Sequence, residues 1–325
     1  MKTLNELYRQ KEQCVKNIRA YRVYGDSKGI KEPYQEKFAS PEYIALMKDL
    51  FAEYDAVMAE IFKLQLSLKG RDHFGKDNVW VWGGPTPSWG GSMAKDASIK
   101  AANYFGFDNV MYVYGPLNEE TMEIHKNCGK VICHLGQNCR TQGAQALGDI
   151  EEAELLSKLS VKYPNVRGGV VDDMIGNSWG KYNHNIYKGM HDALKKHNPE
   201  MELYGVVYTH ELDMPQARFL SDCIDRVILW TWDSDELAKL EMNVEKCRTV
   251  FPGKKIMMGV FMFDYGLKIM PNTPASMLYQ LTKAKKFLQE GKIDDVVILG
   301  DREIEKCPEA AVTIKDFFAK EFALQ

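Results

Sequence analysis

Two adjacent carboxylates, Asp172 and Asp173, are the residues of this sequence whose type and spacing point most directly to chemistry. They end a short apolar stretch, residues 166–172. A carboxylate that leaves water costs on the order of several kcal/mol unless it is paired or hydrogen-bonded. Because side chains alternate along a strand, one aspartate could point into a pocket while the other lies at its rim. The alternative is that one aspartate caps the next helix and the other is solvated.

Two carboxylates this close could divide acid and base work between them. Each disfavours ionisation of the other, so one pKa is raised and that group keeps its proton near neutral pH. In glycoside cleavage one carboxyl group protonates the leaving oxygen, and a second acts as nucleophile or base. In substrate-assisted enzymes the acetamido oxygen of the sugar attacks instead, while one carboxylate orients it and the other is the general acid.

A repeating pattern of short apolar strands and helical segments provides the framework for this pair. The expected strands are residues 79–83, 109–115, 131–134, 166–172, 203–208, 226–232, 256–264 and 295–300. Near-continuously apolar strands that alternate with helices indicate a parallel sheet covered on its outside, and eight such units predict a (β/α)8 TIM barrel. An open doubly wound sheet is the structural alternative. The stretch Gly83-Gly84-Pro85 is not a GxGxxG loop, and no Walker motif occurs, so we expect no nucleotide cofactor.

Residues 1–70 have apolar positions close to helical spacing and predict a helical extension packed on a barrel domain of residues 71–325. Ser40 and Pro41 are typical of a helix start, with serine as the cap and proline at the first helical position. A charged, turn-rich link, residues 24–33, precedes them. The extension could cover the barrel floor, form a dimer surface or line the rim of the site, and the sequence fixes neither this role nor the oligomeric state.

Barrel enzymes carry their sites at the carboxyl ends of the strands, where this sequence is rich in aromatic and polar residues. Five of the six tryptophans follow strand ends, and flat apolar surfaces beside hydrogen-bonding groups suit carbohydrate, although any single tryptophan is more often core. We expect substrate contacts from Trp82, Trp89, Tyr114, Asn138, Trp179, Tyr208, His210, Trp230, Trp232, Asp233 and Asp301. Glu211 and Asp264 are the candidates for a second catalytic carboxylate.

The aspartate pair in residues 170–174 (Val-Val-Asp-Asp-Met) resembles the Asp-Asp pair at the fourth strand of the β-N-acetylglucosaminidase and hyaluronidase family of glycoside hydrolases. Residues 112–116, 134–136 and 227–231 are similar to the family in the same order, so the resemblance covers about residues 79–235. It implies that Asp172 orients the amide, Asp173 is the general acid, Trp230 is a pocket wall and Asp264 binds a sugar hydroxyl.

Three features of the sequence depart from this family. The seventh strand ends in Phe263-Asp264-Tyr265 where the family carries Trp-Asp-Asn. The first strand lacks the acidic, glycine-rich opening of the family, and the helical amino terminus replaces a small α/β domain. The resemblance therefore implies a glycosidase with carboxylate acid/base chemistry, with substrate assistance on an N-acetyl sugar as one route.

Two other functions remain open at this point. A divalent-metal-dependent barrel enzyme, such as a sugar isomerase, epimerase or lyase, could use oxygen and nitrogen donors on neighbouring strand ends, although no HExxH spacing supports it. A non-catalytic carbohydrate-binding barrel is the third candidate. Hydrolysis by a serine or cysteine nucleophile is not supported, because no GxSxG elbow or evident His-paired cysteine occurs.

Composition gives no support for a nucleic acid or a membrane as a partner, so the carbohydrate substrate indicated by the strand-end residues remains the expected partner. The 325 residues carry a formal net charge of -3, which gives no basic surface for nucleic acid. No run reaches the roughly 18 apolar residues of a membrane-spanning helix. Residues 1–6 lack the apolar core of a secretory signal, and the seven cysteines contain no CxxC. We therefore expect a reduced cytoplasmic protein, or an exported one whose signal peptide is missing from this sequence.

Overall fold

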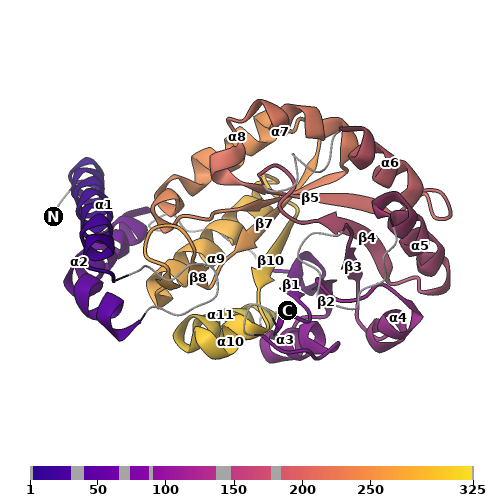
Figure 1. Ribbon diagram of the computed structural model, residues 1–325, viewed down its shortest axis with the longest axis horizontal. Coiled ribbons are helices and arrows are strands. Elements are labelled where there is room, and N and C mark those ends of the chain that lie inside the picture. The colour runs from indigo at the N-terminus through magenta and orange to yellow at the C-terminus, as the bar shows by residue number, and fades with distance from the viewer. Residues whose placement is uncertain are drawn as a thin grey trace.

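Eight parallel strands close into a barrel (Figure 1). The computed structural model describes residues 3–30, 40–65, 74–87, 91–136, 148–176 and 184–323 of the chain. Around the barrel the strands follow chain order, and the last pairs with the first. They are β1 (Val79–Gly83), β2 (Asn109–Tyr112), β3 (Val131–His134), β4 (Val166–Val171), β5 (Glu202–Tyr208), β6 (Arg226–Trp230), β7 (Lys255–Val260) and β10 (Asp295–Leu299). The predicted (β/α)8 barrel is confirmed.

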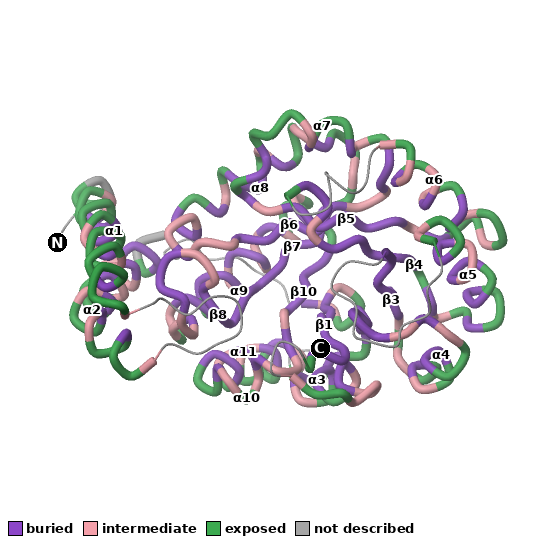
Figure 2. Tube along the Cα trace, viewed as in Figure 1, coloured by how far each residue is buried: buried purple, intermediate pink, exposed green. Residues whose placement is uncertain are grey.

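Helices surround the barrel and turn their apolar faces inward, as the buried stretches in Figure 2 show. They are α3 (Ala97–Phe105), α4 (Glu119–His125), α5 (Asp149–Lys162), α6 (His184–Leu194), α7 (Pro215–Leu220), α8 (Leu240–Val250), α9 (Pro274–Gln289), α10 (Arg302–Lys306) and α11 (Pro308–Phe322). Short 3-10 turns are η1 (Lys76–Asn78), η3 (Thr209–Glu211), η4 (Ser221–Cys223) and η5 (Ser234–Lys239). The strands are buried on both faces, which explains their near-continuous apolar sequence. No helix among the described residues is long and apolar enough to cross a membrane.

Side chains fill the barrel interior, and one glycine makes room for the largest of them. The inward-facing residues Ile132, Val170, Ile228 and Met257 are buried together with Trp230. A Cβ on Gly259 of β7 would lie 2.1 Å from the indole of Trp230. The absence of a side chain at this position therefore allows the tryptophan to pack flat against the neighbouring strand.

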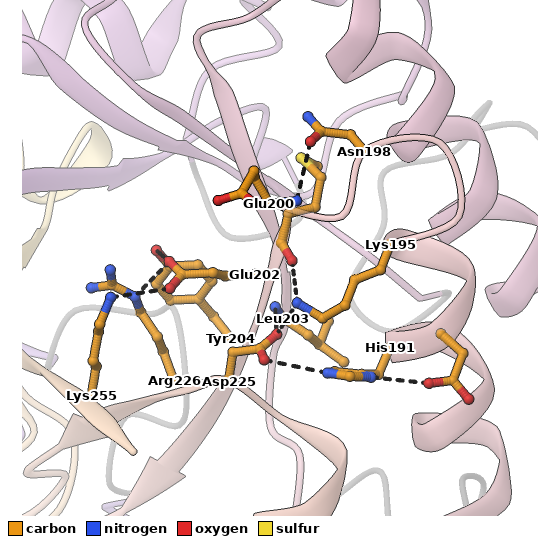
Figure 3. Close-up of polar contacts among 12 residues, drawn as sticks. His191, Lys195, Asn198, Glu200, Glu202, Leu203, Tyr204, Asp225, Arg226 and Lys255 are labelled. Carbon is orange, nitrogen blue, oxygen red and sulfur yellow. Dashed lines mark hydrogen bonds and ion pairs between the residues drawn. The ribbon is translucent and has the colours of Figure 1, made fainter. Parts of the chain in front are cut away.

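Charged residues at the amino ends of the strands form a network on the face opposite the expected site (Figure 3). Asp225 accepts a hydrogen bond from the Leu203 amide at 2.8 Å and lies 3.0 Å from the Lys195 Nζ atom. Arg226 donates to Glu202 at 2.7 Å. Side chains on this face of a barrel usually serve stability, and these contacts tie the starts of β5 and β6 to each other and to Lys195, which directly follows α6.

The two helices of the amino-terminal extension are α1 (Leu4–Ser27) and α2 (Pro41–Gln65), which pack against each other at one side of the barrel (Figure 1). The predicted start of α2 is confirmed, because Ser40 Oγ accepts a hydrogen bond from the Tyr43 amide and Pro41 is the first helical residue. Part of the expected link is helical, since α1 continues through Ser27. Phe62 of α2 stacks on Tyr279 of α9 with a centroid distance of 4.1 Å.

The seventh strand is shorter than predicted. β7 ends at Val260, and the chain then leaves the barrel to form β8 (Phe263–Asp264), which pairs antiparallel with β9 (Met270–Pro271). The apolar run Phe261-Met262-Phe263 continues the sequence pattern of a buried strand because these residues are buried in the loop as well. Sequence periodicity alone does not separate the two environments.

Replacing Gly259 by alanine should destabilise the protein, because the new methyl group must displace the Trp230 ring in a close-packed core. We expect a loss of about 1–3 kcal/mol in the free energy of unfolding, measured by chemical denaturation. Gly75→Ala is the matched control, since its Cβ would meet only the side chain of Asn78 at 3.1 Å. Equal stability of both variants would contradict the packing described for Trp230.

Candidate active site

A cleft of about 930 Å³ opens at the carboxyl ends of β4 to β7, where the sequence predicted the site. Several elements supply its lining, including the α1 helix. Among the predicted site residues, the cleft is lined by Trp82, Tyr114, Asp172, Asp173, Tyr208, His210, Glu211, Trp230, Trp232 and Asp233. Trp89, Asn138 and Trp179 lie outside the described residues.

Asp172 lies at the inner end of a chain of hydrogen bonds. The Tyr114 hydroxyl donates to Asp172 Oδ2 at 3.0 Å, and the indole N–H of Trp82 donates to that hydroxyl at 3.3 Å. Burial, followed by the charge of Asp173, raises the pKa of Asp172 to about 8, although the hydrogen bonds from Tyr114 and the Asp173 amide act in the opposite direction. Near neutral pH the Asp172 carboxyl group is therefore mostly protonated.

Asp173 directly follows and lies nearer to solvent. Its carboxylate accepts a 2.6 Å hydrogen bond from the Tyr208 hydroxyl at the end of β5. Asp173 has φ 46° and Tyr114 has φ 63°, so both adopt the left-handed region that side chains other than glycine rarely enter. Such strain is tolerated where the surrounding structure enforces it, often at functional sites. Here it lets the chain turn sharply and present two consecutive carboxyl groups to one cleft.

Glu211 holds the turn after β5. Its side chain accepts a hydrogen bond from the Tyr208 amide at 2.9 Å and is buried, and burial raises its pKa. The Gly176 amide also hydrogen-bonds this carboxylate. Glu211 thus fixes the segment that carries Tyr208, while its position in the cleft lining keeps it available as a second carboxylate.

Aromatic rings form flat surfaces on the β5 to β7 side of the cleft. Trp232 stacks on Tyr265 with ring centroids 5.0 Å apart and an interplanar angle of 27°. Tyr208 and His210 are nearly parallel, at 5.5 Å and 9°. Trp230 is buried below them and packs on Phe261. This mixture of ring faces and hydrogen-bonding groups is the type of surface that binds sugar rings.

Asp264 does not line the cleft and instead joins two loops. Its buried carboxylate accepts hydrogen bonds from Ser234 Oγ at 2.6 Å and from the backbone amides of Gly266, Leu267 and Lys268 at 3.0–3.1 Å. The shorter β7 explains this placement, because residue 264 lies beyond the barrel. The carboxylate is thereby occupied in holding the loops after β6 and β7 together.

Asp233 and Asp301 are the remaining predicted carboxylates. Burial and the charges of Asp264 and Asp235 raise the pKa of Asp233, which lines the cleft, to about 8. Asp301 follows β10 with φ 125° and is not part of the cleft lining. Its pKa is raised to about 7, mainly by burial, and its Oδ2 has no partner among the described residues.

The sequence offered no signal for Arg19, which reaches the cleft from α1. It lies far along the chain from every strand end, on a helix whose role the sequence left open. Helix residues of the barrel, such as Lys239, Met242 and Lys246, also line the cleft without a local motif. The rule that sites lie at strand ends does not identify which outer helices contribute side chains.

No three His, Cys, Asp or Glu side chains lie together as a metal-ligand set within the part of the chain that the structure describes. The candidate donors after β4, β5 and β6 occupy one cleft, but Asp264 and Asp301 are not part of it. The metal-dependent alternative therefore gains no supporting observation from these residues.

The chain resembles several solved structures at low sequence identity. No family model and no curated protein sequence matches the chain. The spore cortex-lytic enzyme SleL from Bacillus cereus is 9% identical with a TM-score of 0.49, and the match covers 77% of this chain and 75% of that chain. Bee venom hyaluronidase is 12% identical, with a TM-score of 0.40 and coverage of 76% and 98%. A chain of the tryptophan synthase complex from Pyrococcus furiosus is 10% identical, with a TM-score of 0.44 and coverage of 75% and 96%.

At this level of similarity none of these matches carries an argument about activity. The names of the matched proteins themselves state different reactions. The assignment of the barrel rests on the strand pairing of this chain, and its chemistry must be argued from the cleft.

Asp172→Asn should change how stability depends on pH. Because burial raises the folded-state pKa of Asp172 to about 8, this group stabilises the fold below its unfolded pKa of about 4, and the contribution is lost as pH rises through about 8. Asparagine cannot ionise, so the melting temperature of the variant should rise relative to that of the wild-type protein between about pH 4 and about pH 8 and stay level above that. A difference that stays constant over this range would contradict the buried, protonated carboxyl group.

Proposed function

We propose that the protein is a glycoside hydrolase whose acid/base chemistry is performed by the Asp172–Asp173 pair. The observation that carries the proposal is the pair itself: a buried carboxyl group with a pKa of about 8 next to a more exposed carboxylate, both in the lining of an aromatic cleft. A group with a pKa near the working pH can both hold and deliver a proton.

In this proposal Asp173 is the general acid and Asp172 is its orienting partner. Asp173 is the more exposed of the two and is aimed by the Tyr208 hydroxyl, while Asp172 is fixed by Tyr114. Near neutral pH the pair holds a proton on its buried member. For Asp173 to act as the acid, this proton passes from Asp172 to Asp173, which then protonates the leaving oxygen of the bound sugar.

The second catalytic function has two candidate sources. With an N-acetyl sugar, the acetamido oxygen of the substrate would attack, and the Asp172 side chain would orient the amide. With other sugars, an ordinary two-carboxylate route would need another carboxylate, and Glu211 is the candidate that lines the cleft. Asp264 is occupied in joining the two loops, so Glu211 has the stronger case.

A panel of 4-nitrophenyl glycosides that includes the N-acetyl-hexosaminides, assayed with and without EDTA, tests the proposed activity. We expect release from at least one glycoside that survives EDTA. An activity abolished by the chelator would instead support the metal-dependent alternative. Ligand binding without turnover of either aryl glycosides or oligosaccharides would support a carbohydrate-binding barrel.

Asp173→Asn should lower turnover of an unactivated glycoside by about 10²–10⁴-fold, because the leaving oxygen then departs without a proton. A 4-nitrophenyl glycoside should lose much less, since its leaving group needs little protonation. The same pair of substrates applied to Asp172→Asn shows which carboxyl group acts as the acid. Asp222→Asn, an exposed residue outside the cleft lining, is the matched control. Equal losses on both substrates in both cleft variants would argue against the acid role of the pair.

A further inference from the structure

Among the described residues, three cationic side chains line the cleft, and they are Lys239, Lys246 and Arg19. The two lysines differ from Arg19 in having a carboxylate within hydrogen-bond distance. Lys246 Nζ lies 2.6 Å from Asp213 Oδ2, and Lys239 Nζ lies 2.8 Å from Glu236 Oε1. Both lysines are therefore engaged by a carboxylate at hydrogen-bond distance.

Arg19 has no such partner. Its guanidinium lies 3.8 Å from Asp233 Oδ2, and its donors make no hydrogen bond to any residue that the structure describes. The side chain is 60% exposed, so the guanidinium is accessible from the cleft opening. Burial and the charges of Asp264 and Asp235 raise the pKa of Asp233 to about 8, so this neighbour does not neutralise Arg19 near neutral pH.

The α1 helix holds Arg19 in place through two anchored residues on the same side of the helix. Lys11 is buried and donates to the Asp235 carbonyl oxygen at 2.8 Å. Arg22 donates to the carbonyl oxygens of Gly266 and Leu267, each at 3.1 Å. Arg19 lies between these two anchors in the helix, so its backbone is fixed relative to the loops that follow β6 and β7.

The α2 helix reinforces the same loops. The Tyr54 hydroxyl is 3.2 Å from Ser234 Oγ, and Lys268 Nζ donates to Asp55 at 2.6 Å. These are the loops that Asp264 joins and that carry Trp232 and Tyr265. The amino-terminal helices are thus packed onto the part of the cleft that presents its stacked rings.

We propose that Arg19 is a specificity-determining residue that binds an anionic group, a carboxylate or a phosphate, on the sugar ligand of this cleft. The planar guanidinium offers paired donors that match both groups. Arg19 lies beside Asp233, which follows β6, whereas Asp172 and Asp173 follow β4, so the anion would bind on the β6 side of the cleft. This inference rests on the proposed carbohydrate ligand, but it does not depend on catalysis.

Quenching of tryptophan fluorescence by glucose, glucuronate and glucose 6-phosphate tests the inference, because Trp232 lies in the cleft. At low ionic strength we expect at least one of the two anionic sugars to bind about tenfold more tightly than glucose. If glucuronate alone binds more tightly than glucose, the group that Arg19 binds is a carboxylate. If glucose 6-phosphate alone binds more tightly, that group is a phosphate. Added salt should weaken this preference.

Arg19→Gln should reduce the preference to within about twofold, while Arg19→Lys should keep part of it as a point charge. Arg9→Gln is the matched control, because Arg9 is exposed on the same helix but is not part of the cleft lining. The inference is overturned if neither anionic sugar is preferred by the wild-type protein, or if Arg19→Gln keeps the preference. Since no turnover is measured, these outcomes are independent of the glycosidase assays.

Discussion

The burial of one carboxyl group beside another at the end of β4 is the constraint on which the rest of the site depends. Asp172 is 6% exposed, and neither burial nor the neighbouring Asp173 favours its charge. A carboxyl group in this position keeps its proton or destabilises the fold. The hydrogen bond from Tyr114 and the strained backbone of Tyr114 and Asp173 belong to the same arrangement, because they hold the two carboxyl groups in one cleft.

The barrel provides rigidity for this arrangement, and the outer elements provide the shape of the cleft. The strands fix Trp82, Tyr208 and Trp230 through paired backbone and a filled interior, and β4 places Asp172 directly after its last residue. The loops after β6 and β7 carry the stacked pair Trp232 and Tyr265 and contain the η5 turn and the short β8–β9 pair. Asp264 joins them from within, and the amino-terminal helices hold them from outside. The helical extension therefore contributes to the cleft, because α1 supplies Arg19 to its lining and supports its loops.

Much of the barrel could be predicted from the sequence, because parallel strands buried on both faces need unbroken apolar residues. The predicted strands at residues 79–83 and 131–134 match the structure in both bounds. The seventh strand was overextended, since Phe261 to Phe263 are as apolar in a buried loop as they would be in a strand. Because the strand was predicted to end at Asp264, we expected this residue to contact the sugar. In the structure it lies between two loops instead.

The sequence could predict the site residues that directly follow strands. It could not predict the residues whose place in the cleft depends on how distant elements pack together. Asp172 and Asp173 could be singled out because two adjacent carboxylates at the end of an apolar strand are costly. Which of them is buried could not be inferred, because alternation along a strand permits either. Arg19 could not be inferred at all, since its place in the cleft depends on how α1 packs against loops more than 200 residues away in the chain.

The most direct test of this account is a pH titration of the Asp172 carboxyl carbon by ¹³C NMR, assigned by comparison with Asp172→Asn. The account predicts that this carbon reports a protonated group at neutral pH and titrates near the raised pKa of about 8. Titration near about 4, the ordinary value for aspartate, would show that the carboxyl group is charged in the folded protein and would contradict the central claim.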